Sequence, residues 1–275
     1  MPQAPDHVDA LEAMLDIDHP TKRAAQAWAT DCIGQTTTAS RDLWKSAAAY
    51  GVQGLLVPTE HGGQARSSVE TLLTFEGMGT ATIDLGIVFA LASQSVTITR
   101  ALSRFGTDEQ RKRWLTPLVA GDLFGAFAMT EPESGSDIST LSTLANEQSD
   151  GSFVLTGTKS WITLGPICDV ALVFASTSPE LGQWGITAFI VDTADPAVVR
   201  GNPIAKAGLA GCPWGDLQFD DVRVPADAVL GRVGSGASIF SSIVEAERFF
   251  LYAPLVGASE RLINQCIERA RQRVQ

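Results

Sequence analysis

The chain has 275 residues, of which 45% are hydrophobic and 19% charged, so it has ample apolar material for a folded core and is not expected to be disordered. Its formal net charge of -11 would repel a phosphate backbone, and no dense run of Lys or Arg offsets it. These features argue against a nucleic-acid-binding protein.

Neither a metal site nor an export signal is expected. The four cysteines are scattered without the close pairs of a zinc site, and the three histidines at positions 7, 19 and 61 show no metal-ligand spacing. The N-terminus lacks a basic region followed by an apolar core, and no apolar run could span a bilayer. We therefore expect reduced thiols in a cytoplasmic protein.

The first part of the chain, residues 1–122, is predicted to be a helical domain. From about residue 21 to residue 122 the apolar residues recur at helical spacing, and one helix is expected over residues 86–105. Thr107 and Gln110 have the spacing of a capping box, in which each side chain satisfies a backbone donor of the other residue. This pair predicts the start of the next helix.

The middle part, residues 123–232, is predicted to be a small β-domain. Short apolar or alternating runs are separated there by Gly, Pro, Asp and Ser, as is typical of strands and their turns. The predicted strands are FGAFAMT, FVLTGTK, VALVFAS, ITAFIVD and LQFDDVRV.

The last part, residues 233–275, returns to helical spacing and predicts one long helix, or two helices with a break near Pro254 and Gly257. A helix of roughly 35 residues would be about 50 Å long, and a small β-domain alone cannot bury its apolar stripe. We therefore expect a partner chain to supply further helices, and the isolated chain to be aggregation-prone. The stripe expected to be exposed consists of Phe240, Ile243, Leu251 and Leu255.

Two segments of the predicted β-domain carry the functional argument. FAMTEPESGSD, residues 127–137, combines a strand with a Gly/Ser-rich turn, and KSWITLGP, residues 159–166, has a Trp in a short alternating strand. Each alone has a plain alternative, because the first can be a strand with a polar loop and Trp161 can be simple core packing.

Together and in this order, the two segments resemble the acyl-CoA dehydrogenase family. Further matches are GLLVPTEHGG, RFGTDEQRKRWLTPLVAGD, LQFDDVRVPADAVLG and ERARQRV, so the resemblance covers nearly the whole chain from about Ala24. It implies an α+β fold with an N-terminal helical domain, a middle β-domain and a partial C-terminal helical domain. The chain would lack the last helices of that C-terminal domain.

The resemblance also implies FAD, bound extended in a cleft. In the family, the backbone and hydroxyl at Thr130 hydrogen-bond the flavin edge, Ser136 approaches the pyrophosphate, and Trp161 and Thr163 contact the ring from its other side. Fixed donors at this edge favour hydride uptake. The residues implied to bind FAD are Phe127, Met129, Thr130, Ser136, Trp161, Ile162, Thr163 and Arg273.

Some of these positions depart from the family pattern or reach another subunit. Phe127 stands where many relatives carry Tyr, and Glu133-Ser134 occupies a turn that is commonly Gly-Ala. Arg273 matches an arginine that reaches the FAD of a neighbouring subunit.

The reaction implied is α,β-dehydrogenation, in which a carboxylate removes the α-proton of an acyl thioester and the β-hydrogen leaves as hydride. Most relatives carry this base in the last helices, but some carry it in a segment that matches residues 245–248. Glu247 lies four residues from both Ile243 and Leu251, so it projects from an apolar stripe where desolvation would raise its pKa. Glu247 is therefore the candidate base, and a carboxylate on a partner chain is the alternative.

Three residues are expected near the substrate. Glu245 and Arg248 match positions that border the pantetheine arm, with a simple i,i+3 ion pair as the alternative, and Ser136 is also placed there.

The leading hypothesis is one part of an oxidoreductase of fatty-acid metabolism that acts on an acyl thioester of CoA or of an acyl-carrier protein. The remaining helices would come from a partner protein or a homo-oligomer, and an electron acceptor would reoxidise the flavin. Two alternatives stay open: a non-catalytic structural subunit, and a flavin oxidase or monooxygenase on the same fold.

Overall fold

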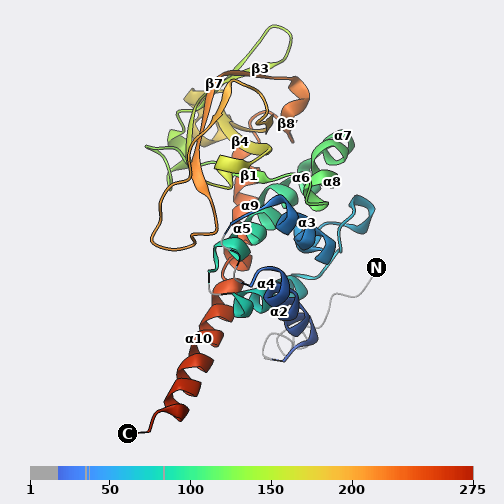
Figure 1. Ribbon diagram of the computed structural model, residues 1–275. Helices are drawn as coiled ribbons and strands as arrows, with labels where there is room; N and C mark the ends of the chain where they lie inside the picture. Colours follow the sequence, from blue (N-terminus) through green and yellow to red (C-terminus); the bar gives the residue numbers. More distant parts are fainter. Residues whose placement is uncertain (1–17, 35, 37, 83, 275) are drawn as a thin grey trace.

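The computed structural model describes residues 18–34, 36, 38–82 and 84–274. Helices form the lower part of the molecule in Figure 1, the β-domain lies above them, and the last helix projects away from both. Residues 1–17, with His7 and the start of the first predicted domain, lie outside the described residues.

The helical part begins with α2 and α4, which pack against each other. The predicted helix over residues 86–105 is continuous but contains a π-helical segment, η3, between α5 and α6. The helices of this part are α2 (Pro20–Cys32), α3 (Arg41–Tyr50), α4 (Ser68–Ala81), α5 (Gly86–Gln94), η3 (Ser95–Thr99), α6 (Arg100–Phe105), α7 (Asp108–Gln110), η4 (Arg111–Leu115) and α8 (Thr116–Val119).

The predicted capping box at the start of α7 is confirmed. The Thr107 N–H donates to Oε1 of Gln110 over 3.0 Å, and the Gln110 N–H donates to the Thr107 hydroxyl over 3.2 Å. Gln110 Nε2 also donates to the carbonyl oxygens of Asp227 and Val229, so this helix start is attached to the β-domain.

The β-domain is one mixed sheet. Among the described residues its strands follow the order β6-β7-β3-β2-β4-β5-β8, with β1 paired to β4. All five predicted strands are present, and three short strands that the sequence did not indicate, β2, β6 and β8, complete the sheet. The strands are β1 (Gly125–Ala128), β2 (Leu144–Glu147), β3 (Phe153–Thr163), β4 (Val170–Ser176), β5 (Ile186–Asp192), β6 (Val198–Arg200), β7 (Trp214–Val224) and β8 (Val229–Leu230).

The C-terminal part forms two helices, α9 (Gly236–Phe250) and α10 (Ala253–Gln272), which confirms the alternative with a break. The first half of α10 crosses α4 closely. A Cβ at Gly79 would lie 2.0 Å from the carbonyl oxygen of Pro254, and a Cβ at Gly257 would lie 2.0 Å from that of Glu76. Only glycine permits this approach.

Ion pairs also join these helices. Lys22 of α2 pairs with Glu76 of α4 and with Glu260 of α10, so this one ammonium connects all three helices.

The expectation of an exposed stripe at Phe240 and Ile243 is wrong. Ile243 is fully buried, and the Phe240 ring lies 6.0 Å from that of Phe127, because α9 packs against both the β-domain and the N-terminal helices. The neighbours of α9 and of the start of α10 therefore come largely from this chain. Leu251 is half-buried.

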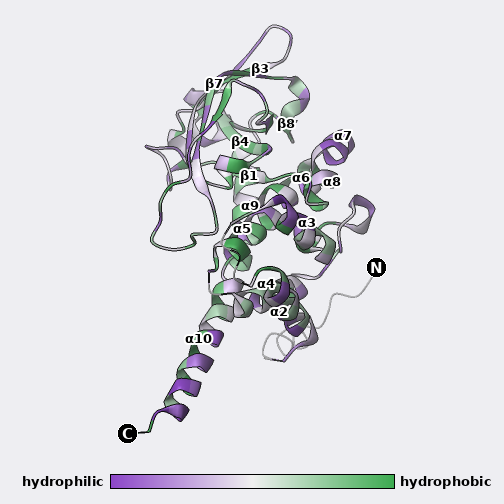
Figure 2. Ribbon diagram, viewed as in Figure 1, coloured by the Kyte–Doolittle hydropathy of each residue, from purple (hydrophilic) through white to green (hydrophobic). Residues whose placement is uncertain are grey.

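Exposed apolar side chains lie instead around the junction of α9 and α10 and along α10. Figure 2 shows hydrophobic residues concentrated in the sheet, α5 and α9, while the projecting part of α10 is mainly hydrophilic with apolar residues between. The exposed residues are Phe249, Tyr252, Leu255, Val256, Leu262, Ile263 and Ile267. Within the described ranges, no helix is both long and apolar enough to cross a bilayer.

Candidate functional site

The predicted flavin-lining segment begins where β1 ends. The Phe127 ring packs 5.0 Å from the ring of Phe174, and the Met129 side chain is only 4% exposed, so both side chains face the interior. From Thr130 the chain leaves the sheet and turns outward, and Ser136 is exposed in that turn. Thr130 is half-buried at this point, where the chain leaves the sheet.

Trp161 lies in an irregular part of β3. The register of β3 against β7 shifts between Lys159 and Ile162, and Trp161 has a φ of 61°, a left-handed conformation that bulky residues rarely adopt. Its side chain is 56% exposed, so the core-packing alternative is wrong. Such backbone strain clusters at binding sites. The next residue, Ile162, is buried.

The two predicted flavin segments meet directly. The Ser160 N–H donates to the carbonyl oxygen of Thr130 over 2.9 Å, so the bulge carrying Trp161 is held against the end of β1. Thr130 and Thr163 are both half-buried, and in the part of the chain that the structure describes neither hydroxyl has a hydrogen-bond partner. The junction therefore offers two free hydroxyls beside an exposed indole ring.

A buried ion pair supports this junction, and our reading of the sequence missed it. Lys159 Nζ lies 2.7 Å from Oε1 of Glu131 and donates to the Met129 carbonyl oxygen over 3.0 Å. The Lys159 side chain is 0% exposed and that of Glu131 is 1% exposed. One signal could have found it: Lys159 falls on the inward side of the alternation that buries Phe153 and Leu155.

In Glu131 the neighbouring charge and hydrogen bonds outweigh the effect of burial on the pKa, whereas in Lys159 burial outweighs the neighbouring charge. Burial would raise the pKa of Glu131, but the charge of Lys159 and hydrogen bonds from Lys159, Thr143 and Ser142 outweigh burial and lower this pKa to about 2. Burial lowers the pKa of the Lys159 ammonium to about 8, against the opposing effect of Glu131. The carboxylate is thus firmly ionised.

Glu247 lies in a different environment, a pocket of about 490 Å³ between α5, α9 and the start of α10. The pocket wall is mainly apolar and includes Leu85, Phe89, Leu209, Val244 and Leu251. Burial raises the pKa of Glu247 to about 7, although the positive charge of Arg248 lowers it somewhat. The predicted rise in pKa is therefore confirmed.

The other predicted residues of this helix are placed differently. Arg248 lines the Glu247 pocket, whereas Glu245 is exposed and outside its lining. Among the ion pairs of the described residues, none joins Glu245 to Arg248, so the simple ion-pair alternative finds no support. Arg273 is exposed and directly follows α10, the helix that projects from the rest of the molecule in Figure 1.

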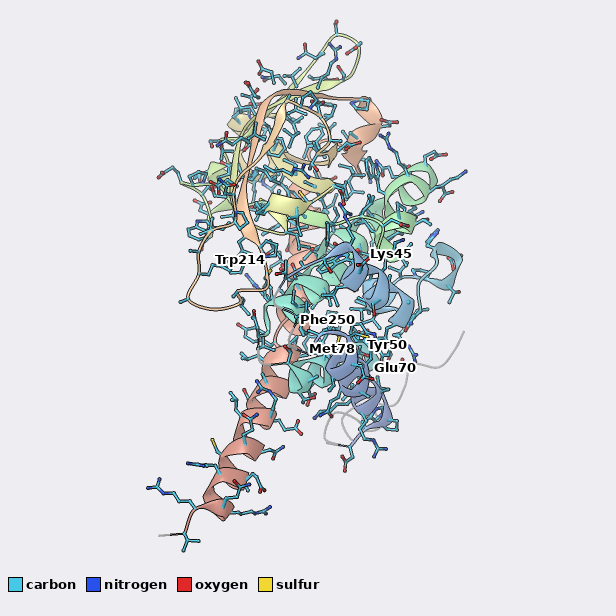
Figure 3. The ribbon with its side chains drawn as sticks, in the orientation of Figure 1. Lys45, Tyr50, Glu70, Met78, Trp214 and Phe250 are labelled. Atoms are coloured by element: carbon cyan, nitrogen blue, oxygen red, sulfur yellow. The ribbon has the colours of Figure 1, made fainter. Side chains whose placement is uncertain are left out.

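An aromatic contact connects the β3 junction to the Glu247 pocket. Thr163 pairs with Trp214 across β3 and β7, and the Trp214 ring lies 6.2 Å from that of Phe89, which lines the pocket. Figure 3 shows Trp214 above Phe250 and Met78, which belong to one buried cluster at the base of α9. The structure therefore places both predicted sites around the junction of the β-domain and the helices.

Other parts of the described chain give less support for a functional site. A second cavity, of about 430 Å³ between α7 and the end of β7, contains none of the predicted site residues. No group of three or more His, Cys, Asp or Glu residues that could hold a metal ion is found in the described ranges.

Comparisons with known protein families match both the helical part and the β-domain. Residues 19–122 match the model of the acyl-CoA dehydrogenase N-terminal domain, and residues 126–222 match that of the acyl-CoA dehydrogenase middle domain. An L-prolyl-[peptidyl-carrier protein] dehydrogenase of Pseudomonas fluorescens is 38% identical over 84% of this chain and 61% of its own length.

Solved structures give the same result. The prolyl acyl carrier protein oxidase AnaB has a TM-score of 0.89 and 32% identity over 93% of this chain and 69% of its own. An FAD complex of PigA has a TM-score of 0.88 and 34% identity over 93% of this chain and 68% of its own. The chain spans about 61% of the length of the curated relative named above. These matches in sequence and structure show that the chain belongs to the acyl-CoA dehydrogenase family.

Proposed function

We propose that this protein is an FAD-dependent dehydrogenase that forms an α,β double bond in an acyl thioester, with Glu247 as the base. One observation carries the proposal: a half-buried carboxylate, without an ion-pair partner among the described residues, lines an apolar pocket next to the predicted flavin junction. Buried carboxylates without a partner are costly, and they are typical of sites that use a proton acceptor.

The residues at the β3 junction fit a flavin ring. The exposed indole of Trp161 offers an aromatic face, and the free hydroxyls of Thr130 and Thr163 offer hydrogen bonds. The exposed turn at Ser136 offers a hydroxyl and backbone N–H groups for a phosphate, as the resemblance implies. When bound, the flavin would supply the hydride acceptor, which this chain's own side chains cannot provide.

The pocket gives Glu247 two properties that a base for an α-proton needs. Its pKa near 7 makes the carboxylate a stronger base than an exposed glutamate, while part of the population remains ionised at neutral pH. The apolar wall, including Phe89 and Leu251, would keep water from the carboxylate once an acyl group fills the pocket. Arg248 at the same pocket offers a positive charge to the polar part of the substrate.

We favour a thioester of a carrier protein over one of CoA. The Pseudomonas relative and AnaB are named as enzymes of prolyl groups on carrier proteins, and both are similar to this chain over most of its length. A small cyclic acyl group would also fit within the pocket of about 490 Å³. The name of AnaB supports a second candidate, an oxidase that passes electrons to oxygen.

The exposed apolar residues of α10, including Leu262 and Ile267, support packing against further helices of the family's C-terminal domain. We propose that these helices belong to the complete enzyme or to a neighbouring subunit.

The decisive experiment is anaerobic stopped-flow reduction of the bound flavin by prolyl carrier protein, with butyryl-CoA for comparison. Glu247→Gln should slow reduction by several orders of magnitude because the proton acceptor is lost. Glu245→Gln is the matched control, since Glu245 is on the same helix but exposed and outside the pocket. Near-wild-type reduction by the Glu247→Gln variant would remove Glu247 from the mechanism. Rapid oxygen consumption during turnover would favour the oxidase.

A further inference from the structure

We propose that the buried Lys159–Glu131 pair positions and polarises the flavin-binding junction. The pair would fix the end of β1 against the bulge of β3 and strengthen the Thr130 N–H as a donor to the flavin edge. This inference rests on the proposed FAD-binding function and assigns positioning residues to it.

The pair ties together three segments that are far apart in the sequence. Lys159 on β3 binds both the Glu131 carboxylate and the Met129 carbonyl oxygen. Oε2 of Glu131 accepts from the N–H of Ser142 over 2.6 Å and from its hydroxyl over 2.7 Å, and Oε1 accepts from the Thr143 N–H over 3.0 Å. The end of β1, the segment just before β2 and the start of the β3 bulge are thus attached to a single buried charge pair.

Stability alone gives a poor reason for this pair. Removing two charges from water costs several kcal/mol per ion, and well-packed apolar residues often serve as well or better. What apolar residues cannot supply is a fixed positive charge at a defined carbonyl oxygen. The Lys159 ammonium delivers that charge to the Met129 carbonyl oxygen, in the peptide group that also carries the Thr130 N–H, the predicted flavin contact.

The Met129 carbonyl and the Thr130 N–H belong to the same peptide group. A charge-assisted hydrogen bond to the carbonyl oxygen polarises the peptide, and in a low-dielectric interior this makes its N–H a stronger donor. Thr130 lies beyond Ala128, the last paired residue of β1, and its N–H has no partner among the described residues. The N–H is therefore free to donate to a ligand.

The other side of the junction depends on the same pair. Lys159 precedes Ser160, whose N–H donates to the Thr130 carbonyl oxygen, and Trp161 follows in its strained left-handed conformation. Anchoring Lys159 fixes the start of the bulge, so the indole is held at a constant distance from Thr130. The Lys159–Glu131 pair then fixes the positions of both Thr130 and Trp161, the predicted flavin contacts on the two sides of the junction.

The test is the double variant Lys159→Met/Glu131→Gln, measured for FAD dissociation constant and flavin midpoint potential. Because no buried charge is left unpaired, we expect a folded protein. FAD binding should weaken about tenfold or more, and the potential should fall by about 30 mV, the equivalent of tenfold for a two-electron couple. In the protein without FAD, amide exchange of Ser160 should quicken relative to the amides of β4 and β5.

The matched control is Lys22→Met/Glu76→Gln, which neutralises a second poorly exposed Lys–Glu pair between α2 and α4 and leaves the more exposed Glu260 of α10 without Lys22. It should leave FAD affinity and potential unchanged. If the double variant at Lys159 and Glu131 keeps wild-type affinity and potential, the pair has no positioning role and the inference fails. If the wild-type protein binds no FAD, it is the proposed function that fails.

Discussion

Glu131 in the β-domain is a fully buried carboxylate and Glu247 on α9 is a half-buried one, and their surroundings are opposite. Glu131 has a buried ammonium and three further hydrogen bonds, and its pKa is lowered to about 2. Glu247 has an apolar wall and the adjacent Arg248, and its pKa is raised to about 7. The comparison indicates two uses of burial: a fully satisfied carboxylate organises backbone, whereas an unsatisfied one is ready to accept a proton.

The largest expected effect on stability comes from breaking the satisfied pair on one side only. Lys159→Met leaves the Glu131 charge buried without its counter-ion, which should lower the free energy of unfolding by about 3 to 5 kcal/mol. Urea denaturation followed by circular dichroism measures this loss. Lys159→Met/Glu131→Gln should recover most of it. A single variant as stable as wild type would show that Glu131 is not held by Lys159.

Glu247→Gln should have a smaller effect of the opposite sign, and only at high pH. The folded pKa of about 7 exceeds the usual 4.5, so the contribution of Glu247 to stability is full below pH 4.5 and is lost as pH rises through 7. At pH 8.5 the variant should be more stable than wild type by about 2 kcal/mol, after discounting for partial solvent exposure.

Denaturation midpoints at pH 5 and pH 8.5 distinguish this prediction from a general packing effect. The difference between the variant and wild type should be larger at pH 8.5. Equal differences at both pH values would mean that Glu247 titrates normally and is not desolvated.

Local sequence patterns predicted the parts of the fold that depend on neighbours along the chain. The Thr107 capping box and the long strands, such as β5 with its run of apolar residues, need no distant partner to be recognised. The strands β6 and β8 have only three and two residues, too few to show a period, and they exist because β7 and β5 pair with them. Short edge strands are determined by their partners.

The same distinction applies to the candidate site. The pocket position of Glu247 follows from its spacing to Ile243 and Leu251 on one helix, so the sequence could indicate it. Lys159 and Glu131 are 28 residues apart and each resembles an ordinary surface charge, so only the fold brings them together. For Phe240, the expected exposure was wrong because its covering residues, including Phe127 and Phe174, come from other elements.

The smallest expected effect concerns the free hydroxyl at the junction that the Lys159–Glu131 pair supports. Thr130→Val removes a donor at nearly constant volume, so the lost hydrogen bond should weaken FAD binding by about 0.5 to 1.5 kcal/mol, or roughly 2- to 13-fold. The unfolding free energy of the protein without FAD should stay within about 0.5 kcal/mol, because that hydroxyl has no partner among the described residues. Thr30→Val on α2, whose hydroxyl binds the Gln26 carbonyl oxygen, is the control for a general loss of a hydroxyl. Fluorescence titration with FAD measures all three proteins, and equal dissociation constants for wild type and Thr130→Val would exclude the hydroxyl as a flavin contact while leaving the Thr130 N–H as the donor at that edge.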